Sequence, residues 1–190
     1  MTVAERPGLM TTEQLLALPE DGKERWLIRG ELREKEMTRR NRGHSRIEAK
    51  IGFLLHKWMD SRGGPRGEVL VGEAGVVLRR NPDTAVGVDV AYVSPQSADA
   101  DPHENKFFAG IPVLVVEILS PSDNHEEVSE KVVSYLEAGV KLAWVVDPRF
   151  RTITVYRGDR EPQLFNVTQS VSGEPHLPGF EVAVNDVFTR

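Results

Sequence analysis

The sequence contains no cysteine, so neither disulfide bonds nor thiolate zinc sites are available to this protein. It also lacks any apolar run of membrane-spanning length, and residues 1–12 lack the apolar segment of a signal peptide. Cytoplasmic residence without membrane attachment is therefore our default expectation. Internal repeats and low-complexity tracts are absent as well.

The sequence also has no excess of positively charged residues. The formal net charge of −5 argues against a general nucleic-acid coat protein, although it says nothing about a local basic patch. What the sequence does contain is 39% hydrophobic and 28% charged residues, which is typical of a globular protein with a real core. The length of 190 residues predicts one domain, in which residues 1–24 form an N-terminal appendage.

The most apolar stretch of the chain spans residues 111–122. Nearly every residue from 113 to 119 is aliphatic, which predicts a strand buried on both faces and central in a sheet. Glu117 interrupts this pattern, and a buried carboxylate costs several kcal/mol unless a cation, hydrogen bonds or a proton compensates it. Glu117 therefore either binds a hard divalent cation, forms a buried ion pair with a basic residue, or reaches water at the strand end.

A second acid, Asp89, interrupts another apolar strand at residues 86–93. Two carboxylates on neighbouring strands can share a divalent ion, which polarises a phosphoryl oxygen and lowers the pKa of a bound water. The central strand is followed by an expected helix with Asp123 as N-cap and Gly139 at its end. Lys131 lies on the apolar face of that helix, where its ammonium group can stabilise a phosphoryl transition state. Acid, acid and lysine together suit phosphodiester hydrolysis.

The first long helix is expected at residues 43–61, with one apolar stripe. His44 and Glu48, spaced i and i+4, lie at the border of that stripe. Four arginines precede or open this helix, and they are either a solvated surface run or a phosphate-binding surface at a helix N-terminus. These arginines are Arg39, Arg40, Arg42 and Arg46.

The rest of the pattern predicts a mixed sheet, because a strand–helix–strand crossover over residues 113–146 is flanked by hairpins. A capping box from Thr11 to Gln14 predicts a short N-terminal helix. A charged hairpin that turns at Gly30 suits a sheet edge. The other expected segments are strands at 68–71, 75–79, 142–146, 152–156 and 163–167, a polar loop at 94–110, and a closing tail at 180–188.

Several of these segments together resemble the Uma-type restriction endonucleases of the PD-(D/E)XK nuclease superfamily. The resemblance rests on residues 117–122, on Lys131 and Tyr135, and on residues 138–140 and 144–148, and it extends to residues 28–32, His44, 89–94 and 177–180. It implies a restriction-endonuclease-like α/β (α+β) core with a central mixed sheet flanked by helices. It also implies an endonuclease that depends on Mg²⁺ (or Mn²⁺), acts on DNA and is commonly a homodimer.

Carried over to this sequence, the resemblance assigns the motif's two metal-binding acids to Asp89 and Glu117. The literal Pro82-Asp83 pair is expected in a turn, with no strand to hold its carboxylate inward, so Asp89 is the better match. Leu119 stands where the motif normally has its lysine. The resemblance places that lysine on the following helix, at Lys131.

The same superfamily resemblance offers Glu48 as an additional catalytic acid that holds a metal-bound water. A surface acid in a salt bridge is the alternative for Glu48, and His44 either caps its helix or contacts DNA phosphate. The leading hypothesis is a metal-dependent DNA endonuclease. The alternatives are a nucleic-acid-binding or scaffold protein on a nuclease fold that no longer cuts, and a hydrolase of another phosphate ester.

Overall fold

The computed structural model describes residues 8–37, 41–101, 106–121 and 123–189. Its helices are α1 (Thr12–Leu16), α2 (Arg42–Asp60), α3 (Pro95–Ala100), α4 (His125–Ala138) and α5 (Val184–Phe188). The first strands are β1 (Lys23–Ile28), β2 (Glu31–Glu36), β3 (Glu68–Arg79), β4 (Thr84–Val93), β5 (Phe108–Ala109) and β6 (Leu114–Ile118). The remaining strands are β7 (Leu142–Asp147), β8 (Thr152–Arg157), β9 (Arg160–Phe165), β10 (Ser170–Ser172) and β11 (Glu181–Ala183).

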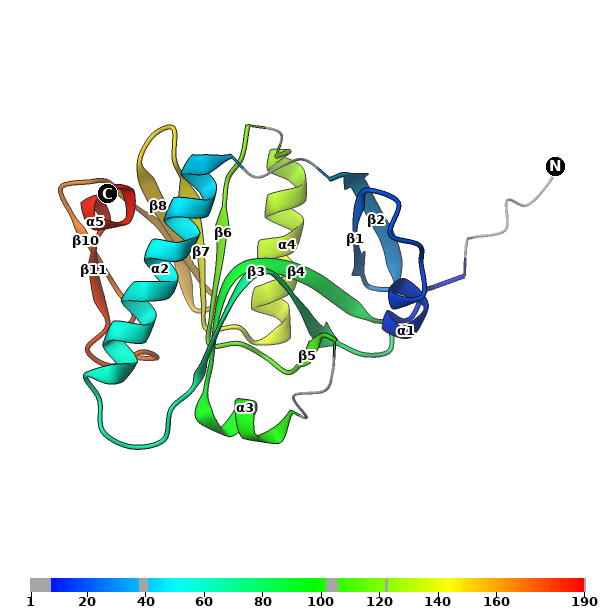
Figure 1. Ribbon diagram of the computed structural model, residues 1–190, viewed down its shortest axis with the longest axis horizontal. Coiled ribbons are helices and arrows are strands. Elements are labelled where there is room, and N and C mark those ends of the chain that lie inside the picture. The colour runs from blue at the N-terminus through cyan, green and yellow to red at the C-terminus, as the bar shows by residue number, and fades with distance from the viewer. Residues whose placement is uncertain (1–7, 38–40, 102–105, 122, 190) are drawn as a thin grey trace.

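Nine strands form one mixed sheet with the order β2-β1-β4-β6-β7-β8-β9, in which β3 pairs with β4 and β5. Strands β6 and β7 are parallel, as are β3 and β5, and the other neighbours are antiparallel. The predicted α/β class, with a central mixed sheet flanked by helices, is confirmed (Figure 1). No helix in the described part of the chain is both long and apolar enough to cross a membrane.

Strand β6 is central and buried along its whole length, as the aliphatic run predicts. Its side chains alternate between two hydrophobic cores: Val116 packs with residues of α2, whereas Val115 packs with residues of α4. The two long helices therefore cover opposite faces of the sheet. Because a strand with both faces covered has no solvated side, every polar residue on β6 requires a buried partner.

The two long helices start from different caps. Helix α2 begins after Asn41, whose side chain accepts a hydrogen bond of 2.9 Å from the backbone N–H of His44. Helix α4 begins after Asn124, so the prediction of Asp123 as its N-cap is wrong. Asp123 instead accepts a hydrogen bond of 2.7 Å from the backbone N–H of Ser120, within the turn that leaves β6. Gly139 ends α4 as expected, with a φ of 102° that favours glycine.

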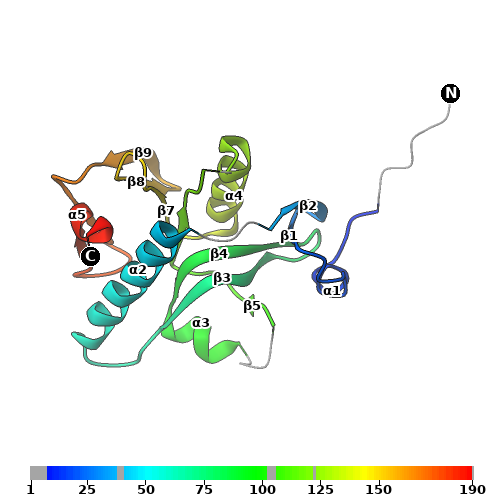
Figure 2. The ribbon, with the colours of Figure 1, turned by 45° about the horizontal axis from the view of Figure 1, so that its top comes forward.

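Two segments differ from the sequence prediction. The strands expected at 68–71 and 75–79 are one long strand, β3, with a bulge at Gly72 and Glu73, where φ is positive and the register with β4 shifts. The polar segment after β4, predicted as a loop, contains the short helix α3, which Ser94 caps. Strands β3 and β4 run side by side from beneath α2 to the hairpin β1–β2 (Figure 2).

The N-terminal helix and hairpin are as predicted. Thr11 and Gln14 form the capping box of α1, and Leu15 on that helix packs against Leu27 of β1. The hairpin β1–β2 lies at one edge of the sheet and is joined to β4 beside Leu27. Its position at the end of the β3–β4 ribbon brings one of its faces over α4.

Candidate active site

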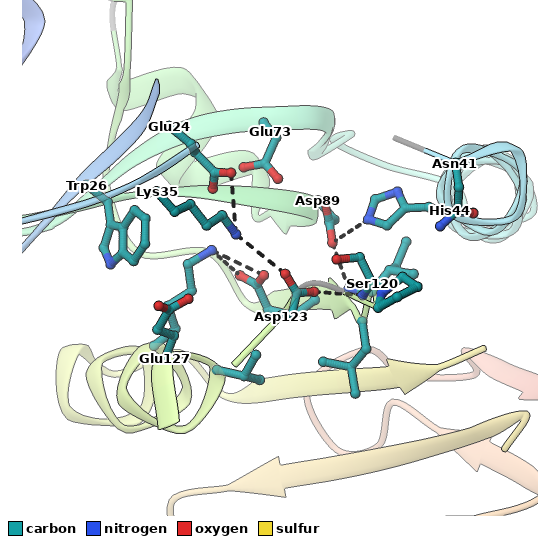
Figure 3. Close-up of a pocket in the computed structure, with 16 residues that line it drawn as sticks. Glu24, Trp26, Lys35, Asn41, His44, Glu73, Asp89, Ser120, Asp123 and Glu127 are labelled. Carbon is teal, nitrogen blue, oxygen red and sulfur yellow. Dashed lines mark hydrogen bonds and ion pairs between the residues drawn. The ribbon is translucent and has the colours of Figure 1, made fainter. Parts of the chain in front are cut away.

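A pocket of about 350 Å³ opens where β6 ends, between the hairpin β1–β2, the start of α2 and the first turns of α4. Figure 3 shows side chains from these elements pointing into one space. Acids outnumber basic side chains in its wall. The lining residues are Glu24, Trp26, Lys35, Asn41, His44, Glu73, Asp89, Glu117, Ile118, Leu119, Ser120, Pro121, Asp123, Glu127, Val128 and Lys131.

The two predicted acids come together because β4 and β6 are antiparallel neighbours. Val90 pairs with Val116, so one further step along this register places Asp89 across from Glu117. Both residues are buried, with 3% and 9% of their surface exposed. The carboxylate of Asp89 accepts a hydrogen bond of 2.7 Å from the backbone N–H of Ile118, which fixes its orientation beside Glu117.

Lys131 points from α4 toward the same pair of acids. Its Nζ lies 3.3 and 3.4 Å from the two carboxylate oxygens of Glu117 and donates to the carbonyl of Gly87 at 3.1 Å. The hydroxyl of Tyr135, one turn further along α4, also donates a hydrogen bond to Glu117. The buried ion pair is thus the arrangement that compensates Glu117 in this structure, in the wall of a pocket that opens where β6 ends.

Burial governs the ionisation of these groups. Burial raises the pKa of Glu117, and the charge of Lys131 opposes this effect while the charge of Asp89 adds to it, so the net pKa is raised. Burial alone lowers the pKa of Lys131, but the negative charges of Glu117, Glu24 and Asp89 together outweigh burial, and the pKa of the ammonium group is raised. Lys131 therefore stays positively charged. Burial, followed by the charge of Glu117, raises the pKa of Tyr135, which remains a hydrogen-bond donor.

His44 lies between two acids. Its Nε2 is 3.2 Å from Oδ2 of Asp89, and its Nδ1 is 3.8 Å from Oε2 of Glu48. The expectation of Glu48 as a surface acid is wrong, because only 9% of its surface is exposed. Glu48 is absent from the described residues that line the pocket, and one of its contacts is with His44. A role for Glu48 in holding a metal-bound water stays a prediction.

The predicted basic surface is only partly within the described residues. Arg42 and Arg46 are exposed on the first two turns of α2, the helix that contributes His44 to the pocket, and neither lines the pocket. Arg39 and Arg40 lie outside the described residues. Contact of this surface with DNA stays a prediction.

Three residues that surround the site were not among the predicted site residues. Trp26 and Lys35 belong to the hairpin that is predicted as a charged sheet edge, and Tyr135 is named only among the residues that carry the family resemblance. The signal was the alternation along β1, where Glu24 and Trp26 share a face and Lys35 pairs across from Glu24. A tryptophan within such a charged strand indicates that this face is covered.

The donor set of the pocket suits a hard divalent cation. Among the residues that the structure describes, no three histidine, aspartate or glutamate side chains gather closely enough to hold a metal ion. The two acids Asp89 and Glu117 are therefore the candidate ligands for a metal ion. Mg²⁺ keeps several of its waters and is usually bound by one or two carboxylates, whereas zinc requires three or four protein ligands. Two carboxylates therefore fit Mg²⁺ or Mn²⁺ and do not fit zinc.

The fold and this pocket define a restriction-endonuclease-like α/β protein. Residues 12–185 match the family described as "Uma2: Putative restriction endonuclease", so the chain belongs to that family, as its motifs predict. It is similar to a crystal structure described as a "putative nuclease belonging to DUF820 from Anabaena variabilis ATCC 29413", with a TM-score of 0.78 and 20% sequence identity over 94% of this chain and 97% of that chain. No curated protein matches the sequence.

Proposed function

We propose that this protein is a metal-dependent endonuclease that hydrolyses phosphodiester bonds in DNA. One observation carries the proposal: the carboxylates of Asp89 and Glu117 and the ammonium group of Lys131 meet in one pocket, with Lys131 3.3 Å from Glu117. Membership of a family described as restriction endonucleases supports the same reaction.

Asp89 and Glu117 would hold the Mg²⁺ (or Mn²⁺) ion. When bound, this cation would polarise a phosphoryl oxygen and lower the pKa of a bound water. The chain itself orients both carboxylates: the N–H of Ile118 donates to Asp89, and the hydroxyl of Tyr135 donates to Glu117. Such supporting hydrogen bonds keep ligand oxygens in position when the neighbouring charges change.

Lys131 would supply positive charge to the transition state. Its ammonium group lies in the pocket wall, and its contact with the carbonyl of Gly87 holds it in place. Leu119, which occupies the motif's usual lysine position, lines the same pocket without a charge. Lys131 on α4 therefore takes the role of the motif lysine, because it brings an equivalent charge to the acids from another element.

The DNA substrate and the assembly state follow from less direct arguments. The exposed Arg42 and Arg46 stand on the first two turns of α2, the helix that contributes His44 to the pocket, and they favour a polyanionic substrate. We also expect a homodimer, because two sites related by a twofold axis can address both strands of a duplex. Light scattering on the purified protein measures this directly.

The test of the function is cleavage of supercoiled plasmid with Mg²⁺ or Mn²⁺. The native protein should nick or linearise the plasmid, and Glu117→Gln should not. Glu126→Gln is the matched control, since Glu126 is an exposed acid on α4 outside the pocket, and it should cut like the native protein. Equal cutting by Glu117→Gln would reject the assigned site.

A second candidate is a DNA-binding protein that no longer cuts. It is favoured by the ion pair itself, because Lys131 and Tyr135 satisfy Glu117 without a metal ion. This candidate is supported if native protein binds duplex DNA but leaves plasmid intact at every metal concentration. Hydrolysis of a small phosphate ester without any cutting of DNA would instead support the third alternative.

A further inference from the structure

A second lysine enters the pocket from the hairpin β1–β2. Lys35 stands on β2, and Figure 3 shows its side chain directed from the hairpin toward Asp123. Lys131 lines the same pocket from α4. Both ammonium groups lie near the indole ring of Trp26, at 5.7 Å for Lys35 and 5.8 Å for Lys131. Trp26 thus positions two positive charges on one side of the acids.

Lys35 is held more loosely than the other basic residues of its hairpin. Its Nζ is 3.4 Å from Glu24 and 3.5 Å from Asp123, beyond the usual length of about 2.7–2.9 Å for a charge-assisted hydrogen bond. Arg29 and Arg33 pair with acids of α4 at 2.7 and 2.8 Å. These tighter pairs fix the hairpin against α4, which leaves Lys35 at a set position with weak partners.

The two pocket lysines differ in their access to a ligand. The side chain of Lys131 is 8% exposed and is bound to Glu117, whereas the side chain of Lys35 is 33% exposed. The acid-rich wall opposes the entry of an anion, so an entering phosphate group needs a reachable cation. Lys35 provides one, because it can exchange two long contacts with carboxylates for a shorter contact with a phosphate oxygen.

We propose that Lys35 is a substrate-binding residue that contacts a non-bridging phosphate oxygen of the DNA strand in the pocket, in exchange for Glu24 and Asp123. This inference rests on the proposed nuclease function and adds a substrate contact to it. Lys131 would act at the reacting phosphate, and Lys35 would hold the DNA backbone from the hairpin side. The hairpin is then part of the substrate-binding surface.

The experiment measures binding of a fluorescently labelled DNA duplex as a function of salt concentration. Lys35→Met is compared with Lys23→Met, since Lys23 is equally exposed at 33%, stands on the same hairpin and is paired with Glu34 outside the pocket. Both substitutions are made in the Glu117→Gln background with Mg²⁺ so that the duplex stays uncut. Native protein in EDTA gives a second uncut background in which both comparisons are repeated.

Lys35→Met should raise Kd by roughly tenfold or more, which corresponds to the removal of one hydrogen bond between charged groups. It should also reduce the slope of log K against log salt by about one unit, as expected when one phosphate is no longer neutralised. Lys23→Met should change neither quantity. An unchanged salt slope in Lys35→Met would overturn the proposal and leave Lys35 as a structural ion-pair partner.

Glu24→Gln provides a second readout that a structural role would not move. It removes a competitor for Lys35, so it should tighten DNA binding more when Lys35 is present than when it is replaced by methionine. Equal tightening of DNA binding by Glu24→Gln with and without Lys35 would overturn the proposal that Lys35 exchanges Glu24 for phosphate.

Plasmid cleavage is measured separately. A native protein that binds but does not cut refutes the endonuclease function and leaves the Lys35 result standing. A native protein that does not bind the duplex refutes Lys35 as a substrate contact.

Discussion

Lys131 Nζ lies 3.3 Å from Oε2 of Glu117, and the two residues are separated by 14 positions in the chain. One stands on a helix that covers the sheet, and the other stands near the end of a strand buried on both faces. The same lysine therefore has two tasks: it compensates a buried carboxylate, and it can present positive charge to a substrate. Variants whose stability and activity change independently distinguish these two tasks of Lys131.

Replacing Lys131 by methionine should lower the cleavage rate by roughly two orders of magnitude or more, the scale of one electrostatic donor to a transition state. Because Glu117 then has no cation, the metal-free fold should lose up to about 3–5 kcal/mol of its free energy of unfolding. Chemical denaturation in EDTA measures this loss. The double variant Lys131→Met with Glu117→Gln should regain much of the stability and none of the activity. A single variant as stable as the native protein would show that the ion pair is not required for folding.

Divalent cations should stabilise the native protein through Asp89 and Glu117. The two acids face each other in a poorly solvated place, and a cation that binds only the folded state adds about 2.7 kcal/mol at 100 times its dissociation constant. The melting temperature should therefore rise with Mg²⁺ or Mn²⁺ relative to EDTA. Asp89→Asn and Glu117→Gln should lose this response, and the exposed-site control Glu126→Gln should keep it. The same response in all four proteins would reject the shared site.

Asp83 should stabilise the fold at neutral pH without taking part in cleavage. Burial alone would raise its pKa, but its carboxylate accepts hydrogen bonds from the hydroxyl and the N–H of Thr12 at 2.6 and 2.8 Å. These bonds, with those from Asn81 and Arg80, lower the pKa of Asp83 from 3.8 to about 2. Asp83 of the literal Pro82-Asp83 pair therefore holds the first residue of α1 in place through these hydrogen bonds, and it lies in a turn, as expected.

A folded-state pKa below the ordinary value means that this stabilisation is present above pH 3.8 and is lost as the pH falls toward 2. Asp83→Asn should therefore cost about 1–2 kcal/mol at neutral pH, a range that allows for screening of the half-exposed Arg80. The difference from native protein should vanish near pH 2. Urea unfolding across this pH range measures it, and plasmid cleavage by the variant should stay at the native level. A loss of cleavage in folded Asp83→Asn would make this residue a candidate catalytic acid.

The basic start of α2 should carry sequence-independent DNA affinity. Replacing the exposed Arg42 and Arg46 by alanine should weaken binding to all duplexes and reduce the salt slope by about 0.9 for each phosphate that the protein no longer neutralises. The charge-matched control is Lys141→Ala with Arg160→Ala, at the end of the sheet where β6 begins. Loss of affinity of the same size in the control would mean that only net charge matters.

The sequence by itself determined most of the helices and strands and the residue types of the candidate site. An aliphatic run with one acid predicts a central strand with Glu117 buried in it, and the helical spacing after that strand predicts an inward Lys131. Both predictions are confirmed, because burial follows from local periodicity and from the cost of exposing apolar surface. The motifs also identify the family, since they combine these residue types in one order along the chain.

Only the tertiary structure decided which side chains meet. Asp89 reaches Glu117 because β6 pairs with β4, although β5 lies between them in the chain. Glu48 is buried beside His44, and Lys35 faces the pocket, because α2 and the hairpin β1–β2 pack where they do. Periodicity reports whether a residue is covered, but strand order, register and helix packing depend on contacts between segments far apart in sequence. Distances between functional groups are set by those long-range contacts.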